Sequence, residues 1–176
     1  MRLGINEFHK FVKGELSIKI LDYYQNLKIL SEADLQSIVW KLLTEFIQEN
    51  DPKPEIFKVL NKPYLKGLKI HPDIVIFRKD IPWVIIELKE KRILNKRSAF
   101  SEQERLLQNK NEIRAKRGYL LYVARSGDGA VLQGKKTESA SRFFFEIPII
   151  LENVLTHSDF KRWEKEFKTW SKFSNV

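Results

Sequence analysis

Two stretches within the first fifty residues carry hydrophobic side chains at the spacing of an amphipathic helix. The first set is Leu16, Ile20, Tyr24 and Leu27. The second set is Leu35, Ile38, Val39, Leu42, Leu43 and Phe46. Ser31 precedes the second set as an N-cap residue, with Asp34 three positions later. We therefore predict one helix over about residues 15–30 and a second from Ser31 to about Glu49.

The middle of the chain changes from helical spacing to runs of β-branched and aromatic residues. The two densest runs are Asp73–Phe77 and Trp83–Lys89, separated by about five residues that end in a proline. Two such runs with a short polar connection predict an antiparallel β-hairpin. A shorter run over residues 55–60 predicts one more strand before the hairpin.

Helical and strand signals alternate again after the hairpin. Ser101 and Glu104 form a capping box, which predicts a helix over about residues 102–116 with Gly118 as its C′ residue. The remaining predicted elements are a central strand over residues 119–123, apolar on both faces, a strand over residues 142–147 and a helix over residues 159–173.

This succession of elements predicts an α/β fold in which helices flank the faces of a sheet. We expect a single domain over residues 1–176, with its core at about residues 31–124. The helix over residues 15–30 and the strand and helix within residues 142–175 are additions to that core.

Composition limits the possible partners. The chain has 176 residues, is 43% hydrophobic and has a formal net charge of +9, which favours a polyanionic partner. It contains no cysteine and only three histidines, so a metal would be held mainly by oxygen atoms. No apolar run is long enough to span a membrane, and no secretory signal is visible, so we expect a cytoplasmic, intracellular protein without membrane contact.

Three charged residues stand at strand ends of the predicted hairpin. Glu87 and Lys89 are two positions apart and share one face of their strand, while Asp73 begins the neighbouring strand beside them. Two adjacent carboxylates favour a hard divalent cation such as Mg²⁺ or Mn²⁺, for which the backbone carbonyl of Leu88 is a further ligand. Lys89 would orient a water that attacks phosphorus. The alternative is a surface ion-pair group at a strand end.

The motif His71-Pro72-Asp73, thirteen residues and then Glu87-Leu88-Lys89 resembles the PD-(D/E)XK nuclease superfamily, near the archaeal Holliday junction resolvase type. The resemblance covers roughly residues 31–124 and implies the restriction-endonuclease-like α-β-β-β-α-β core with a mixed sheet. It also implies metal-dependent hydrolysis of a DNA phosphodiester by water. Asp73 and Glu87 would bind Mg²⁺, or Mn²⁺ in its place, and Lys89 would be the catalytic lysine.

Members of this superfamily often add polar residues from the two core helices. The resemblance implies a catalytic, metal-binding glutamate on the first helix, for which Glu32 is the first candidate and Glu45 the second; Glu32 equally fits a role in complementing the helix dipole. On the later helix, Gln103 is a candidate to support the site, although a solvated helix face explains it as well. His71 is a candidate to support the site or contact DNA, or it simply ends a loop.

Positive charge gathers directly after the proposed catalytic lysine. Residues 89–117 contain ten basic and four acidic side chains, a net charge of +6. Such a segment beside a metal site is suited to a phosphate backbone. The candidate DNA-binding residues are Lys91, Arg92, Lys96, Arg97, Lys110, Lys135 and Lys136.

Taken together, the residues and the resemblance predict an Mg²⁺-dependent DNA endonuclease. A structure-specific enzyme for branched DNA or Holliday junctions, acting in DNA repair or recombination as a homodimer, fits the small size of the chain. The alternatives are a non-catalytic DNA-binding module on the same fold, a restriction-type or viral nuclease, and an RNA-directed nuclease.

Overall fold

The structure is a computed structural model, and it describes residues 2–26, 28–29, 31–65, 71–90, 105–106, 108–125, 144–151 and 165. Its elements in chain order are the helices α1 (Ile5–Lys13), α2 (Glu15–Gln25) and α3 (Glu32–Asn50), the short 3₁₀ helix η1 (Pro54–Ile56), and the strands β1 (Phe57–Asn61), β2 (Ile74–Arg78), β3 (Ile81–Glu90), β4 (Arg117–Arg125) and β5 (Phe144–Leu151). Residues 105–106 and 108–112 are also helical. The chain therefore has the mixed α/β architecture that the sequence predicts.

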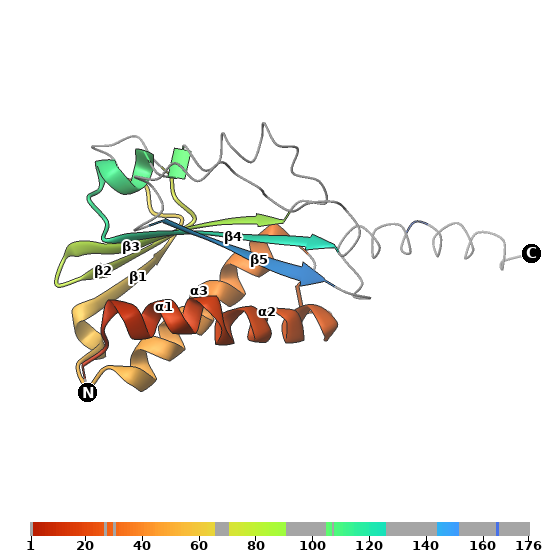
Figure 1. Cartoon of the computed structure of the whole chain (residues 1–176), viewed down its shortest axis with the longest axis horizontal. Coiled ribbons are helices and arrows are strands. Elements are labelled where there is room, and N and C mark those ends of the chain that lie inside the picture. The colour runs from red at the N-terminus through yellow and green to blue at the C-terminus, as the bar shows by residue number, and fades with distance from the viewer. Residues whose placement is uncertain are drawn as a thin grey trace, which may run out of the picture.

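The five strands form one mixed sheet in the order β1-β2-β3-β4-β5. The pairs β1–β2 and β2–β3 are antiparallel, whereas β3–β4 and β4–β5 are parallel. Helices α1, α2 and α3 cover one face, and the helical residues between β3 and β4 lie on the other (Figure 1). The helices thus flank the sheet on both faces, and β4 lies inside it, as expected for a strand that is apolar on both sides.

Alternating side chains of β3 divide the hydrophobic core into two parts. Ile86 and Leu88 pack in the larger part, under the three N-terminal helices. Ile85 packs in the smaller part together with Leu106 and Ile113 from the 105–113 segment. Because side chains of a strand alternate between faces, Glu87 continues the face of Ile85 and lies on the side of the smaller core part.

The predicted antiparallel hairpin is confirmed, but its connection is shorter than expected. Only Lys79 and Asp80 separate β2 from β3, and both have positive φ, 52° and 61°, as in a type I′ turn. A β-bulge lies close to this turn, because Ile76 pairs with Val84 while Phe77 pairs with Pro82. The bulge adds one residue to β3 and directs the Trp83 side chain into the larger core part.

The N-terminal region differs from the expected single helix over residues 15–30. Helix α2 ends at Gln25, where Asn26 takes the C-cap position and donates a side-chain hydrogen bond to the Asp22 carbonyl oxygen (2.9 Å). The sequence reasoning also missed α1, which contributes Phe8 and Phe11 to the core. Helix α3 was predicted closely, and the Ser31 hydroxyl accepts a hydrogen bond from the Asp34 amide as its N-cap.

The helix between β3 and β4 ends earlier than the sequence indicated, and Gly118 is not its C′ residue. Gly118 lies in β4. The C′ position belongs to Arg114, whose φ is 57°. The Ala115 amide donates to the Lys110 carbonyl oxygen (3.0 Å) and the Arg114 amide to that of Asn111 (3.1 Å), which is the Schellman pattern. An arginine therefore adopts the left-handed conformation that usually selects glycine.

The other predictions on regular structure have mixed outcomes. The strand expected over residues 55–60 begins two residues later, because η1 comes first, and the last strand extends to Leu151. The expected helix over residues 159–173 lies outside the described residues except for Lys165, which is helical. Within the described part of the chain, no helix has the length and apolar character needed to cross a membrane.

Candidate acidic site at the end of the hairpin

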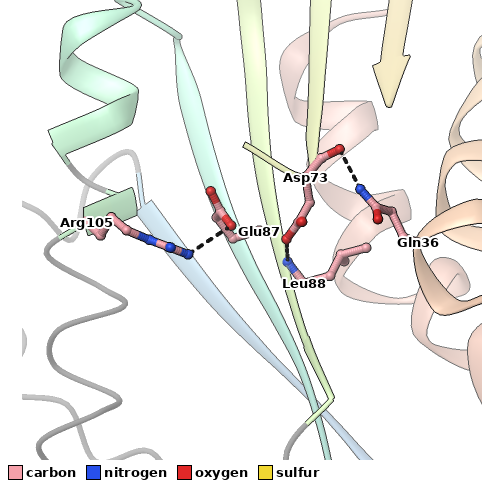
Figure 2. Close-up of polar contacts among 5 residues, drawn as sticks. All are labelled: Gln36, Asp73, Glu87, Leu88 and Arg105. Atoms are coloured by element: carbon pink, nitrogen blue, oxygen red, sulfur yellow. Dashed lines mark hydrogen bonds and ion pairs between the residues drawn. The ribbon is translucent and has the colours of Figure 1, made fainter. Parts of the chain in front are cut away.

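Asp73 is fixed by hydrogen bonds directly before β2. Its side-chain Oδ2 accepts from the backbone N–H of Leu88 on β3 (2.8 Å) (Figure 2). Its backbone carbonyl oxygen accepts from the Lys62 amide (2.8 Å) and from Nε2 of Gln36 on α3 (3.0 Å). These three bonds hold the carboxylate at the end of the hairpin remote from its turn.

Glu87 presents its carboxylate from the neighbouring strand, between Asp73 and Arg105 (Figure 2). The Glu87 side chain is only 3% exposed, and its Oε2 lies 3.3 Å from Nη2 of Arg105. Its other oxygen, Oε1, is buried and accepts from no donor among the described residues, and when protonated this carboxyl can hydrogen bond to Asp73. A buried, unpartnered polar atom is unfavourable by about 1–3 kcal/mol, and more when it carries charge. Glu87 is thus ion-paired through one oxygen, as the alternative interpretation has it, but its carboxylate is buried and not at the surface.

The electrostatics of this site follow from burial and from the second carboxylate. Burial is the largest cause that raises the pKa of Glu87 to about 8, and the negative charge of Asp73 adds to it. The positive charges of Arg105 and Lys89 act in the opposite direction but are weaker. Two adjacent carboxylates therefore retain a proton at neutral pH, which means that the site favours an additional positive charge.

Lys89 lies two residues beyond Glu87 on β3 and is partly buried. Strand geometry gives the two side chains the same face of the sheet, as the sequence predicted. The structure thus brings Asp73, Glu87 and Lys89 to one end of the hairpin. This is the group that the sequence singled out.

The sequence reasoning missed the roles of Gln36 and Arg105. Gln36 is 4% exposed and lies within the apolar stripe of α3, three residues before Val39. The polar side chain of Gln36 at a core position could have indicated its role, because a buried amide requires hydrogen-bond partners. Arg105 entered the sequence argument only as one of many positive charges, and its contact with Glu87 depends on how the following segment packs on the sheet.

The candidate carboxylates of α3 are not brought into this group. Glu32 is exposed in the first turn of α3. Glu45 is 45% exposed in its side chain and faces Lys41 at 3.7 Å, one turn earlier. Among the described residues, no three acidic or histidine side chains cluster closely enough to bind a metal. The site therefore has two carboxylates, Asp73 and Glu87, where the resemblance implied three.

The remaining candidates lie at the margins of the site or outside the described residues. His71 is exposed and stacks on Tyr64, with ring centroids 4.8 Å apart. Lys110 is partly buried, and this burial lowers its pKa. The predicted residues outside the described part of the chain are Gln103, Lys91, Arg92, Lys96, Arg97, Lys135 and Lys136.

Comparison with known proteins adds no relatives. No protein-family model, curated protein or solved structure matches this chain. The interpretation of the site therefore depends on its own geometry and chemistry.

Proposed function

We propose that the chain is an Mg²⁺-dependent nuclease that hydrolyses phosphodiester bonds of DNA, with Asp73, Glu87 and Lys89 as its active site. The observation that carries this proposal is the buried carboxylate of Glu87 next to that of Asp73, with an Oε1 that accepts from no donor among the described residues. A hard divalent cation takes oxygen ligands of this kind and would supply the positive charge that the pair favours.

The donor atoms available at this end of the hairpin suit such an ion. Glu87 offers Oε1, and Asp73 offers Oδ1 because its Oδ2 accepts from the Leu88 amide. The N–H and C=O of one strand residue point to the same side of the strand, so the Leu88 carbonyl is directed toward the side where Asp73 lies. Mg²⁺ keeps several waters and needs only one or two carboxylates from the protein, so a site with two carboxylates is sufficient.

The two cationic side chains have separate roles in the proposed reaction. A bound divalent cation would polarise the phosphate and activate a water. Lys89 would orient the attacking water oxygen and stabilise negative charge as the bond to the leaving sugar oxygen breaks. Arg105 has a 51% exposed side chain and neutralises Glu87 through one 3.3 Å contact. It would exchange that contact for a phosphate oxygen when DNA is bound.

Charge distribution favours nucleic acid as the substrate. Residues 89–117 alone carry a net charge of +6, and this segment starts at Lys89. A phosphate backbone is the polyanion that such a surface attracts. The finer assignments, namely the restriction-endonuclease-like fold, a branched-DNA substrate, a homodimer and an intracellular setting, are part of the same proposal.

A cleavage assay with matched variants tests the proposal. The substrates are branched, linear and single-stranded DNA, each with Mg²⁺, with Mn²⁺ and with EDTA. Asp73→Asn keeps an acceptor for the Leu88 amide but removes the charge, so we expect cleavage to fall by about 100-fold or more. Asp80→Asn is the control, because Asp80 is 77% exposed at the opposite end of the hairpin and asparagine tolerates its positive φ.

The outcomes separate the nuclease from its alternatives. Cleavage that persists in EDTA or in Asp73→Asn would refute the metal-dependent mechanism. DNA binding without cleavage under every condition would favour the non-catalytic DNA-binding module. Cleavage of RNA in preference to DNA would redirect the proposal to an RNA-directed nuclease.

A further inference from the structure

A basic cleft lies at the opposite end of the hairpin from Asp73 and Glu87. Its volume is about 440 Å³, and its lining comes from the start of the chain, the β2–β3 turn and the residue before β4. Four of the nine residues that line it are basic, namely Arg2, Arg78, Lys79 and Lys116, and the others are apolar. The apolar part of the lining includes Trp83 and Pro82.

The four cations of this basic cleft lack a carboxylate partner among the described residues. Arg2, Lys79 and Lys116 are exposed. The Arg78 guanidinium is fixed above the rings of Phe57 and Trp83, 5.1 Å and 5.7 Å from their centroids. This stacking leaves its N–H edge available for an anion.

Two nearby carboxylates, those of Asp80 and Asp51, have partners outside the cleft. Asp80 in the turn pairs with Lys58 at 2.5 Å. Asp51 accepts from the backbone amides of Leu3 (2.9 Å) and Lys53 (2.9 Å). The N-terminus of α1 also borders the cleft through Gly4, but the Glu7 carboxylate lies against Gly4. Recognition of an anion would therefore depend on the four basic side chains, not on the helix dipole.

We infer that the basic cleft binds the phosphate groups of a phosphorylated ligand. Clustered like charges without counter-charges repel one another, and a multivalent anion removes that repulsion. Arginine held by aromatic rings beside flexible lysines is a recurrent way to bind phosphate oxygens. The volume is sufficient for more than one phosphate group.

The basic cleft is distinct from the acidic site. Six residues of extended chain separate Lys79 from Asp73, which corresponds to about 20 Å at about 3.3 Å per residue. Trp83 also faces the larger core part, whereas Glu87 continues the other face of the sheet. The inference therefore goes beyond the proposed nuclease and does not depend on it.

Calorimetric titration with pyrophosphate, in EDTA and at low ionic strength, tests the inference. Lys79→Asn with Lys116→Gln removes two cleft charges, and asparagine suits the positive φ of 52° at position 79. We expect the affinity for pyrophosphate to fall about ten-fold or more. Lys10→Gln with Lys13→Gln is the control, because it removes the same charge from exposed positions of α1 and should leave the affinity within about two-fold.

A second arm identifies the source of the phosphate groups. The unaltered chain, the cleft variant and the control variant are each titrated with a short single-stranded oligonucleotide with and without a 5′-phosphate. A preference for the 5′-phosphate that disappears in the cleft variant assigns the basic cleft to strand ends, whereas pyrophosphate binding alone assigns it to free phosphates. Equal losses in the cleft and control variants, or no binding of any of these anions by the unaltered chain, would overturn the inference.

Discussion

Replacing Glu87 by glutamine removes a buried carboxyl that is costly to ionise, so the effect on stability should depend on pH. In the folded chain the pKa of Glu87 is about 8, against an ordinary value of 4.5. Between these values the folded state holds a proton that the unfolded state has released. Raising the pH therefore destabilises the wild-type chain through this group, and its favourable contribution is complete only below about pH 4.5.

The size of the effect follows from the same two values. Each pKa unit corresponds to about 1.4 kcal/mol, so full ionisation of Glu87 lowers the free energy of unfolding by about 5 kcal/mol relative to low pH. At pH 7 about 3 kcal/mol of that stability is already lost. Glutamine keeps the shape of the side chain without the charge. We expect the stability advantage of Glu87→Gln over wild type to grow by about 3 kcal/mol between pH 5.5 and pH 8.5.

Urea unfolding in EDTA, followed by circular dichroism across that pH range, measures the difference. Glu55→Gln is the matched control, since Glu55 is exposed and its replacement should give a difference that does not change with pH. A constant difference for Glu87→Gln would refute the reasoning from burial. At pH 8, Mg²⁺ at ten times its Kd should stabilise wild type by about 1.4 kcal/mol and leave Glu87→Gln unchanged. If Mg²⁺ does not stabilise wild type, the metal site is contradicted, but the reasoning about the burial of Glu87 is not.

Three further predictions concern residues around the site and the segment that follows it. Gln36→Ala should lower the free energy of unfolding by about 1 kcal/mol, because the Asp73 carbonyl loses one of its two donors but keeps the Lys62 amide; an unchanged free energy of unfolding in urea titrations would contradict this. Lys89→Ala should reduce DNA cleavage by about 100-fold or more while DNA affinity stays within about three-fold. A parallel loss of both would make Lys89 a phosphate contact. Arg114→Gly should be about 1 kcal/mol more stable than Arg114→Ala in thermal unfolding, because glycine relieves the positive φ, and equal stabilities would contradict this.

The elements that the sequence predicted well are those specified by nearby residues. Ser31 and the hydrophobic spacing after it define α3 locally, and the dense β-branched runs define the hairpin. The proximity of Asp73 and Glu87 then follows from strand pairing. This is why the main pair of the candidate site was recognised before the fold was known.

The missed features depend on contacts between distant segments. Gln36 matters because α3 packs against β1 and β3, which brings its side chain to the carbonyl of Asp73, thirty-seven residues later in the chain. Arg105 reaches Glu87 because the helical residues around it pack on the sheet, where Leu106 and Ile113 contact the core beside Ile85. The helix end was misplaced because the glycine rule for C′ positions selected Gly118, whereas Arg114 accepts the left-handed conformation at a cost of about 1 kcal/mol.

The change from antiparallel to parallel pairing at β3 has a kinetic consequence. The antiparallel pairs join strands that are close in sequence, whereas β4 reaches β3 only after a crossover of more than twenty residues. Contacts of low sequence separation form first because their loops close at lower entropic cost. The carboxyl group of Glu87 would then remain an ordinary, hydrated acid in the early hairpin. The pKa of Glu87 would rise only when β4 and the described helical residues before it pack on the sheet. The buried site would therefore form late in folding.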